Sequence, residues 1–185
     1  NLLLHRWLLN LHKLKLEKIL NRSGDYLVKR ENVRICVPRF LQIGKGSLNE
    51  LPEIIKTIGS ISSLLIVTDK QMVEFGYVKK LQDILISAGL KSDVFDNTVP
   101  DPTDKVVLEG IKFLEKYKND AVIGFGGGSP IDTAKAISAM AKFSRNIQDY
   151  KPPSLFNKNG LPIIAIPTTA GTGSEVTHHS VVIDS

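Results

Sequence analysis

The chain has 185 residues, of which 42% are hydrophobic and 23% charged, and its formal net charge is +5. These values are ordinary for a globular protein, and the length fits one α/β domain. The single cysteine, Cys36, excludes a disulfide within the chain, and no stretch approaches the roughly 20 apolar residues that cross a bilayer. We therefore expect a cytoplasmic protein without a membrane partner.

The excess positive charge belongs to the first 32 residues. Residues 1–32 hold seven basic and three acidic side chains, a net charge of +4, and residues 33–185 carry +1. The latter have no basic stripe, so no nucleic-acid partner is expected. Residues 1–32 are interpreted as a basic extension that permits an amphipathic helix, with a membrane-surface or partner-binding helix as the alternative. A signal peptide is disfavoured because Arg6 and other polar residues interrupt the apolar stretch.

From residue 33 onward, apolar patterns of strand and helix type alternate. Apolar runs predict strands at residues 33–37, 64–67, 93–95, 121–123 and 162–166. Apolar residues at helical spacing predict helices over residues 48–58, 78–88, 104–118 and 130–141. This alternation predicts an α/β fold in residues 33–185, a Rossmann-like parallel sheet with helices on both faces. Such sheets bind ligands at the carboxyl ends of their strands.

The run Gly-Phe-Gly-Gly-Gly-Ser-Pro-Ile-Asp-Thr-Ala-Lys at residues 124–135 is the most informative segment. Glycines let a diphosphate approach backbone N–H groups closely, and Ser129 is a good N-cap for the helix that follows, with Pro130 at its first position. The segment therefore predicts a nucleotide cofactor. A structural turn is the alternative, since serine replaces the third glycine of the usual dinucleotide fingerprint. The candidate residues are Gly126, Gly127, Gly128, Ser129 and Asp132, the last as a capping-box partner that supports the loop or as a ligand contact.

A second polar segment, Pro-Thr-Thr-Ala-Gly-Thr-Gly-Ser-Glu-Val-Thr, occupies residues 167–177 after an apolar run. Short hydroxyl side chains on flexible backbone suit a ribose, a pyrophosphate or a carboxamide. A polar loop with Ser and Thr as caps is the alternative. The candidate residues here are Thr168, Thr169 and Thr172.

Together the two segments resemble the hallmark stretches of the iron-containing (group III) alcohol dehydrogenase family. The resemblance extends over residues 33–185, because residues 64–69 and 99–103 also fall where that family carries similar motifs. It implies an NAD(P)- and metal-dependent alcohol dehydrogenase that moves a hydride between a small alcohol or aldehyde and nicotinamide, as a homo-oligomer in its full-length form.

Two aspartates are candidate cofactor contacts. Asp69 follows an apolar run, where a carboxylate accepts from both ribose hydroxyls and repels a 2′-phosphate; capping a helix that starts at Lys70 is the alternative. In the family an aspartate here is associated with NAD, so NAD is expected in preference to NADP. Asp101 departs from the family, in which many members carry asparagine, and this puts a side-chain amide contact in doubt.

The resemblance also implies Fe²⁺ or another divalent metal, bound by one aspartate and three histidines that lie further along than this chain. His5 and His12 are about 10 Å apart if helical, and His178 and His179 point to opposite faces if in a strand. We assign no catalytic residue and no metal ligand. The expected protein is the cofactor-binding half, without the family's all-helical metal-binding domain. The alternatives are a truncated, non-catalytic nucleotide-binding module and a relative of glycerol-phosphate dehydrogenase or dehydroquinate synthase.

Overall fold

The computed structural model describes residues 38–143, 146–150, 159–177 and 179–185. Contacts divide the chain into two units, Asn1–Ile35 and Cys36–Ser185, and all described residues belong to the second. The predicted extension at residues 1–32 and the predicted strand at residues 33–37 lie outside the described residues.

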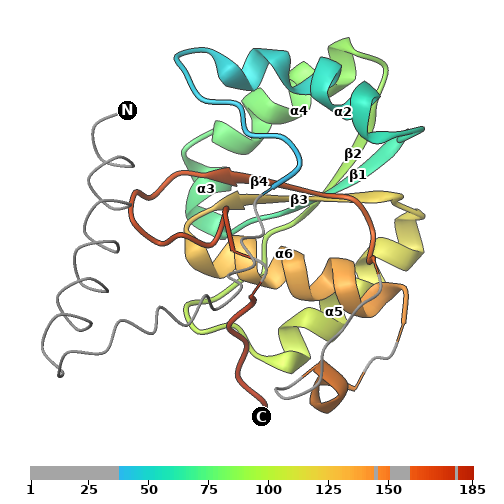
Figure 1. The fold of residues 1–185 in the computed structure, drawn as a ribbon, viewed down its shortest axis with the longest axis vertical. Helices are drawn as coiled ribbons and strands as arrows, with labels where there is room; N and C mark the ends of the chain where they lie inside the picture. Colours follow the sequence, from blue (N-terminus) through green and yellow to red (C-terminus); the bar gives the residue numbers. More distant parts are fainter. Residues whose placement is uncertain (1–37, 144–145, 151–158, 178) are drawn as a thin grey trace, which may run out of the picture. The chain divides into compact units, whose positions relative to one another are not determined.

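Four parallel strands form the sheet of the described domain (Figure 1). They are β1 (Ser63–Val67), β2 (Lys91–Phe95), β3 (Ala121–Gly126) and β4 (Ile163–Pro167), in the spatial order β2-β1-β3-β4. The predicted α/β fold with a parallel sheet is confirmed. After β2 the chain returns to the other side of β1 to form β3, so the strand order reverses between β1 and β3. In open α/β sheets the crevice at such a reversal is where ligands bind.

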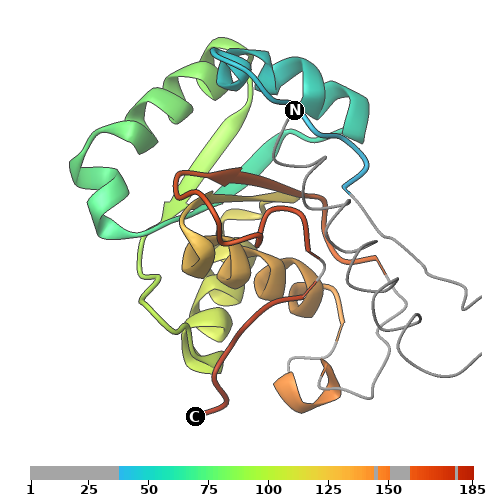
Figure 2. The same cartoon turned by 60° about the vertical axis from the view of Figure 1, so that its left-hand side comes forward.

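Helices cover both faces of this sheet, because alternate side chains of a strand point to opposite sides (Figures 1 and 2). Leu64 and Ile66 of β1 pack against α2 (Leu51–Ile58) and α4 (Tyr77–Ser87). Leu65 and Val67 pack on the other face, against α5 (Asp104–Tyr117) and α6 (Gly128–Ala141). The remaining helical segments are short: η1 (Ser47–Glu50), α3 (Lys70–Glu74) and η2 (Ile147–Tyr150). None of the helices in the described part of the chain is both long and apolar enough to span a bilayer.

Small residues hold α6 close to the sheet. A Cβ placed on Gly124 of β3 would lie 2.9 Å from the Cβ atom of Ala134 and 3.0 Å from the Cα atom of Ile131. A real Cβ atom does not tolerate such distances, so the helix approaches this strand only because residue 124 has no side chain. This packing fixes the start of α6 beside the carboxyl end of β3.

The start of α6 lies two residues earlier than the sequence predicts. Gly127 occupies the N-cap position with extended backbone, and the helix begins at Gly128, so the prediction of Ser129 as N-cap is wrong. Gly126 has φ +148°, which turns the chain directly after its last pairing with β4 and lets the helix begin at once. The capping-box prediction for Asp132 is also wrong, because the residue three positions after the observed N-cap is Pro130. The Asp132 carboxylate oxygen Oδ1 instead accepts from Lys135 Nζ at 3.2 Å.

Candidate functional site

A groove of about 770 Å³ lies at the carboxyl ends of the strands. Four loops line it, one after each strand: residues 69–72 with Phe75 and Tyr77 after β1, 96–100 after β2, 127–130 after β3, and 168–169 after β4. The groove therefore lies at the reversal of strand order, as the general rule for open sheets requires.

The structure brings six of the ten predicted site residues together in this groove: Asp69, Gly127, Gly128, Ser129, Thr168 and Thr169. The other four lie outside its lining. Gly126 ends β3, and Thr172 packs beside Gly128. Asp132 is buried on α6, 8% exposed, and Asp101 is exposed in a left-handed conformation with φ +53°.

Asp69 has a different neighbour at each of its two carboxylate oxygens. Oδ1 accepts from the backbone N–H of Met72 at 2.9 Å and so caps α3. Oδ2 lies 3.5 Å from the position that a Cβ on Gly126 would occupy. The helix-capping alternative is therefore observed, but it engages one oxygen while the other faces the glycine loop.

The floor of the groove is backbone without side chains. Gly127 and Gly128 both line it, and they stand at the N-terminus of α6. The first N–H groups of a helix have no acceptor within the helix, and they lie at the positive end of its dipole. Bare N–H groups without Cβ atoms in front of them fit the pyrophosphate of a dinucleotide, which binds through backbone donors.

The Thr-rich loop packs onto this floor. The Thr168 N–H donates to the carbonyl of Gly126 at 2.9 Å, which extends the pairing of β3 with β4. A Cβ on Gly127 would lie 3.3 Å from Thr169 Oγ1, and one on Gly128 would lie 3.3 Å from Ser174 Oγ. A larger residue at either position would push these hydroxyls outward by a few tenths of an ångström, so glycine lets the two predicted segments pack closely.

One wall of the groove carries none of the ten predicted site residues, although residues 99 and 100 belong to the family-like stretch 99–103. Residues 96–100 follow β2, and their position is fixed by two buried threonine hydroxyls. Thr98 Oγ1 donates to the carbonyl of Thr68 at 2.5 Å, and Thr68 Oγ1 donates to the carbonyl of Phe125 at 2.8 Å. These bonds tie the ends of β2, β1 and β3 together. The local pattern at residues 99–103 did not place this stretch in the groove, because that placement depends on the strand order.

An aromatic pair lies at the rim of the groove. Phe75 and Tyr77 are 66% and 47% exposed, and their ring centroids stand 6.2 Å apart in an edge-to-face arrangement. Exposed rings beside a polar floor give the groove an apolar end, which suits a ligand that carries an aromatic base at one end and phosphates further along. Nothing in the sequence pattern marked these two residues.

Comparison with known proteins identifies the family. The family described as "Iron-containing alcohol dehydrogenase" matches residues 38–185. This chain belongs to the iron-containing alcohol dehydrogenase family. The resemblance stated from the two polar segments is therefore confirmed, and the family is one of oxidoreductases.

Individual members of the family match a similar part of this chain. Lactaldehyde reductase of Escherichia coli (strain K12) is 41% identical over 143 residues, which are 76% of this chain and 37% of that protein. NAD-dependent methanol dehydrogenase of Bacillus methanolicus is 38% identical over 149 residues, 80% of this chain and 39% of that enzyme. The solved structure of 1,3-propanediol oxidoreductase superimposes with a TM-score of 0.78 at 32% identity, covering 83% of this chain and 40% of that one. The chain thus spans about two-fifths of the length of these relatives.

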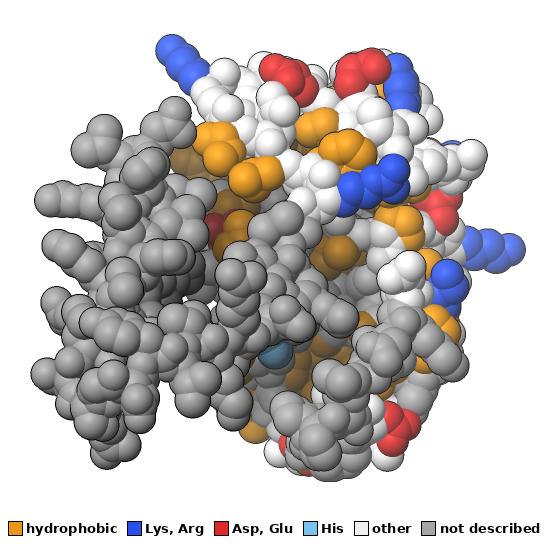
Figure 3. Space-filling view, viewed as in Figure 1, with side chains coloured by type: hydrophobic (Ala, Val, Ile, Leu, Met, Phe, Trp, Pro, Cys, Tyr) orange, Lys and Arg blue, Asp and Glu red, His pale blue; other side chains and the backbone are white. Residues whose placement is uncertain are grey.

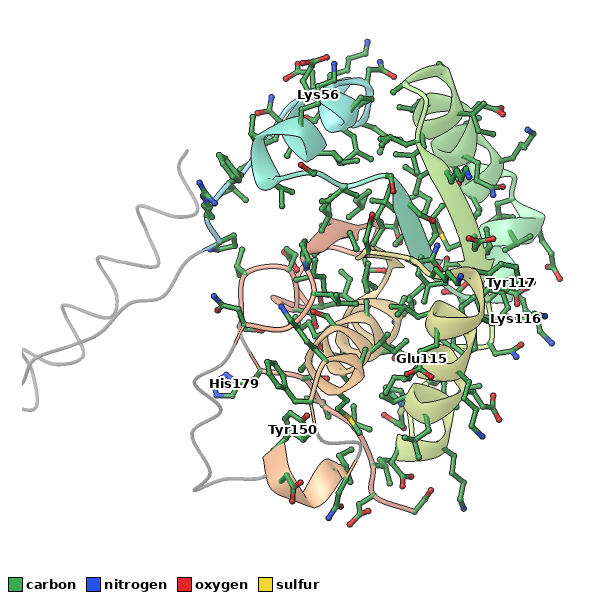
Figure 4. All side chains as sticks on the ribbon, turned by 90° about the vertical axis from the view of Figure 1, so that its right-hand side faces the viewer. Lys56, Glu115, Lys116, Tyr117, Tyr150 and His179 are labelled. Atoms are coloured by element: carbon green, nitrogen blue, oxygen red, sulfur yellow. The ribbon has the colours of Figure 1, made fainter. Side chains whose placement is uncertain are left out.

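The described residues do not fit the metal that the family name implies. Within the described ranges, no three His, Cys, Asp or Glu side chains lie close enough together to hold an ion. His178 lies outside the described residues, and His179 stands on the C-terminal segment beside α6 (Figure 4). No step of the family's chemistry is therefore assigned to a metal held by these residues.

Proposed function

We propose that this chain is the cofactor-binding part of an NAD-dependent alcohol dehydrogenase that interconverts small alcohols and aldehydes. The observation that carries the proposal is the groove between β1 and β3, where Asp69 faces a floor of bare glycine backbone at the N-terminus of α6. The names of the relatives, which include a lactaldehyde reductase and an NAD-dependent methanol dehydrogenase, support this substrate class.

In this proposal each part of the groove has one task. The N–H groups of residues 127–129 bind the pyrophosphate, and the hydroxyls of Thr168 and Thr169 orient the adjoining part of the cofactor. The carboxylate of Asp69 accepts from the ribose hydroxyls and repels a 2′-phosphate, which favours NAD over NADP. NAD, when bound, supplies the acceptor for the substrate hydride. Asp101, Gly126, Asp132 and Thr172 shape these contacts from outside the groove.

The substrate and the divalent metal belong, in this proposal, to the all-helical domain that family members carry in addition. That domain would polarise the alcohol oxygen with its metal, and the hydride would cross between the two domains. This chain by itself then binds NADH but does not turn over an alcohol. The alternative is a nucleotide-binding module with no catalytic role, and the two differ in whether activity appears in the protein complete with that domain.

We also propose a homo-oligomer in the cytoplasm. Figure 3 shows hydrophobic side chains exposed across the face seen in Figure 1, with charged side chains mainly toward its upper and right-hand edges. Among the described residues, the exposed large hydrophobic side chains include Phe40, Leu41 and Ile43, which are 45%, 62% and 80% exposed. Exposed apolar side chains favour association with another surface.

Cofactor titration tests the proposal. We expect NADH to bind saturably to this chain, followed by the fluorescence of the nicotinamide, and to bind more tightly than NADPH. A primary alcohol with NAD and Fe²⁺ should give turnover only when the metal-binding domain is present. Failure of the chain to bind either dinucleotide would overturn the proposal. Binding without turnover in the complete protein would favour the non-catalytic module.

A further inference from the structure

The Lys135 ammonium lies outside the groove and is fully engaged by oxygens. Its side chain, 13% exposed, stands on α6 seven residues after the helix begins, and it does not line the groove. Its Nζ atom donates to three acceptors: Asp132 Oδ1 at 3.2 Å, Thr177 Oγ1 at 3.3 Å and the carbonyl of His179 at 2.7 Å. An ammonium has three N–H donors, so each has a partner.

Thr177 is the last residue of the Thr-rich loop, and His179 belongs to the segment that follows the loop. A further bond holds that segment to α6, because Ser180 Oγ donates to the carbonyl of Asp132 at 2.7 Å. The loop itself, residues 168–177, contains Gly171 and Gly173 with φ +95° and +71°. Its near end is fixed to β3 by the Thr168 N–H, so Lys135 supplies the attachment at its far end.

The C-terminal segment, residues 177 and 179–185, continues from this attachment along α6 to the start of α5 (Figure 2). There the Ile183 N–H donates to the carbonyl of Pro102 at 2.8 Å, and the Asp104 N–H donates to the carbonyl of Ile183 at 2.9 Å. Pro102 lies two residues after the end of the wall formed by residues 96–100. One segment therefore connects the Thr-rich loop on one side of the groove with the β2 wall on the other.

We infer that Lys135 is a positioning residue for the cofactor: it holds the far end of the Thr-rich loop beside α6, so that the loop that carries Thr168 and Thr169 is ordered before a dinucleotide arrives. This inference rests on the proposed function of the groove. A loop that is already ordered loses less conformational entropy on binding than one that the ligand must order. Without the ammonium, the far end of the loop keeps only the bonds of Ser180 and Ile183 further along the chain, so the loop becomes less ordered. Affinity then falls although no direct contact to the cofactor is removed.

Three variants separate this effect from a direct charge effect and from general destabilisation. Lys135→Met keeps the length of the side chain and removes the three hydrogen bonds. Thr177→Val removes one acceptor on the loop without changing any charge. Ser138→Ala is the matched control. Ser138 Oγ also ties α6 to a neighbouring segment, because it donates to the carbonyl of Leu161 at 2.6 Å, but Leu161 precedes β4 and lies away from the groove.

The experiment measures NADH affinity and amide hydrogen exchange of residues 168–177 in each variant, without and with saturating NADH. We expect Lys135→Met to weaken NADH binding roughly tenfold, within the usual range of coupling between sites. We expect Thr177→Val to act in the same direction with a smaller effect, and Ser138→Ala to leave the affinity unchanged. Exchange in the loop should accelerate in the first two variants and return toward the original rate with NADH bound.

Several results would overturn the inference. Unchanged affinity or unchanged loop exchange in Lys135→Met would remove the positioning role. A loss confined to Lys135→Met that disappears at high salt would instead indicate direct attraction of the diphosphate by the charge, since salt screens it. An equal loss in Ser138→Ala would indicate general destabilisation. Absence of NADH binding by the unaltered protein would overturn the proposed function itself, whereas normal binding that Lys135→Met does not weaken would overturn this inference alone.

Discussion

The two oxygens of Asp69 have different neighbours, and substitution can separate what they contribute. Oδ1 caps α3 through the N–H of Met72, and Oδ2 faces Gly126 in the glycine loop. Asp69→Ser retains an oxygen for the N-cap but removes the charge and the second oxygen. Asp69→Ala removes both contributions. The pair of variants therefore measures cofactor recognition and helix capping separately.

The expected magnitudes follow from these contacts. Loss of the cap in Asp69→Ala should lower the free energy of unfolding by about 1 kcal/mol, and Asp69→Ser should retain most of it because serine is itself a good N-cap. Two hydrogen bonds from ribose hydroxyls to a carboxylate contribute roughly 2–3 kcal/mol to NADH binding after the exchange with water is counted. Asp69→Ser should therefore weaken NADH binding roughly 30- to 150-fold. NADPH affinity should stay level or rise, since repulsion of the 2′-phosphate is removed.

Titration of both dinucleotides at one ionic strength, together with urea unfolding followed by circular dichroism, measures these quantities. Equal losses for NADH and NADPH in Asp69→Ser would refute a role of the carboxylate in choosing between them. A Ser variant as unstable as the Ala variant would refute the separation of the two oxygens, because it would show that the hydroxyl does not replace Oδ1 at the cap.

Three further predictions concern packing, pH and metal. Gly124→Ala should destabilise the fold by about 1–3 kcal/mol, because the new methyl group would overlap Ala134 and the backbone of α6, and a urea midpoint equal to that of the unaltered protein would contradict this. Hydrogen bonds from the side chain and backbone of Ser185 lower the pKa of Asp104, so the unfolded state binds the proton more readily. Attachment of Ser185 is then fully stabilising above the ordinary carboxyl pKa of about 3.9 and is lost as the pH falls through the folded value, which the amide NMR signal of Ser185 reports. Removal of divalent metal by a chelator should change the NADH affinity of this chain by no more than about twofold, which corresponds to well under 1 kcal/mol of binding free energy.

Local sequence patterns were sufficient for the fold and for the two loops that form the floor of the groove. The strand at 64–67 was recognisable because a strand covered on both faces is continuously apolar, and β1 is buried throughout. The triple glycine marked the floor because few structures other than a close backbone approach need three glycines in succession. Thr168 and Thr169 followed, since short hydroxyls after a buried strand are placed at the carboxyl edge of the sheet.

Features that depend on residues far apart in sequence could not be predicted. Lys135 is the clearest case, because its acceptors Thr177 and His179 lie 42 and 44 positions away, and a lysine on a helix is otherwise expected to be solvated. The wall at residues 96–100 depends on β2 lying next to β1, which the order of elements in the chain does not determine. The start of α6 was misplaced because the helix begins directly after the turn at Gly126, with Gly127 as N-cap and no side-chain cap from Ser129.

The long sequence separation between the C-terminal segment and its bonding partners has a consequence for synthesis of the protein. Ser185 bonds to Asp104 across 81 positions, so Asp104 is made well before its partner exists. At roughly 5–20 residues per second, the delay is on the order of 4–16 s. The nascent chain can pair β1, β2 and β3 during that interval, while the Lys135 ammonium still lacks the acceptors supplied by Thr177 and His179. The Thr-rich loop is thus attached late in synthesis, and for some seconds the glycine floor of the groove is not yet covered by that loop.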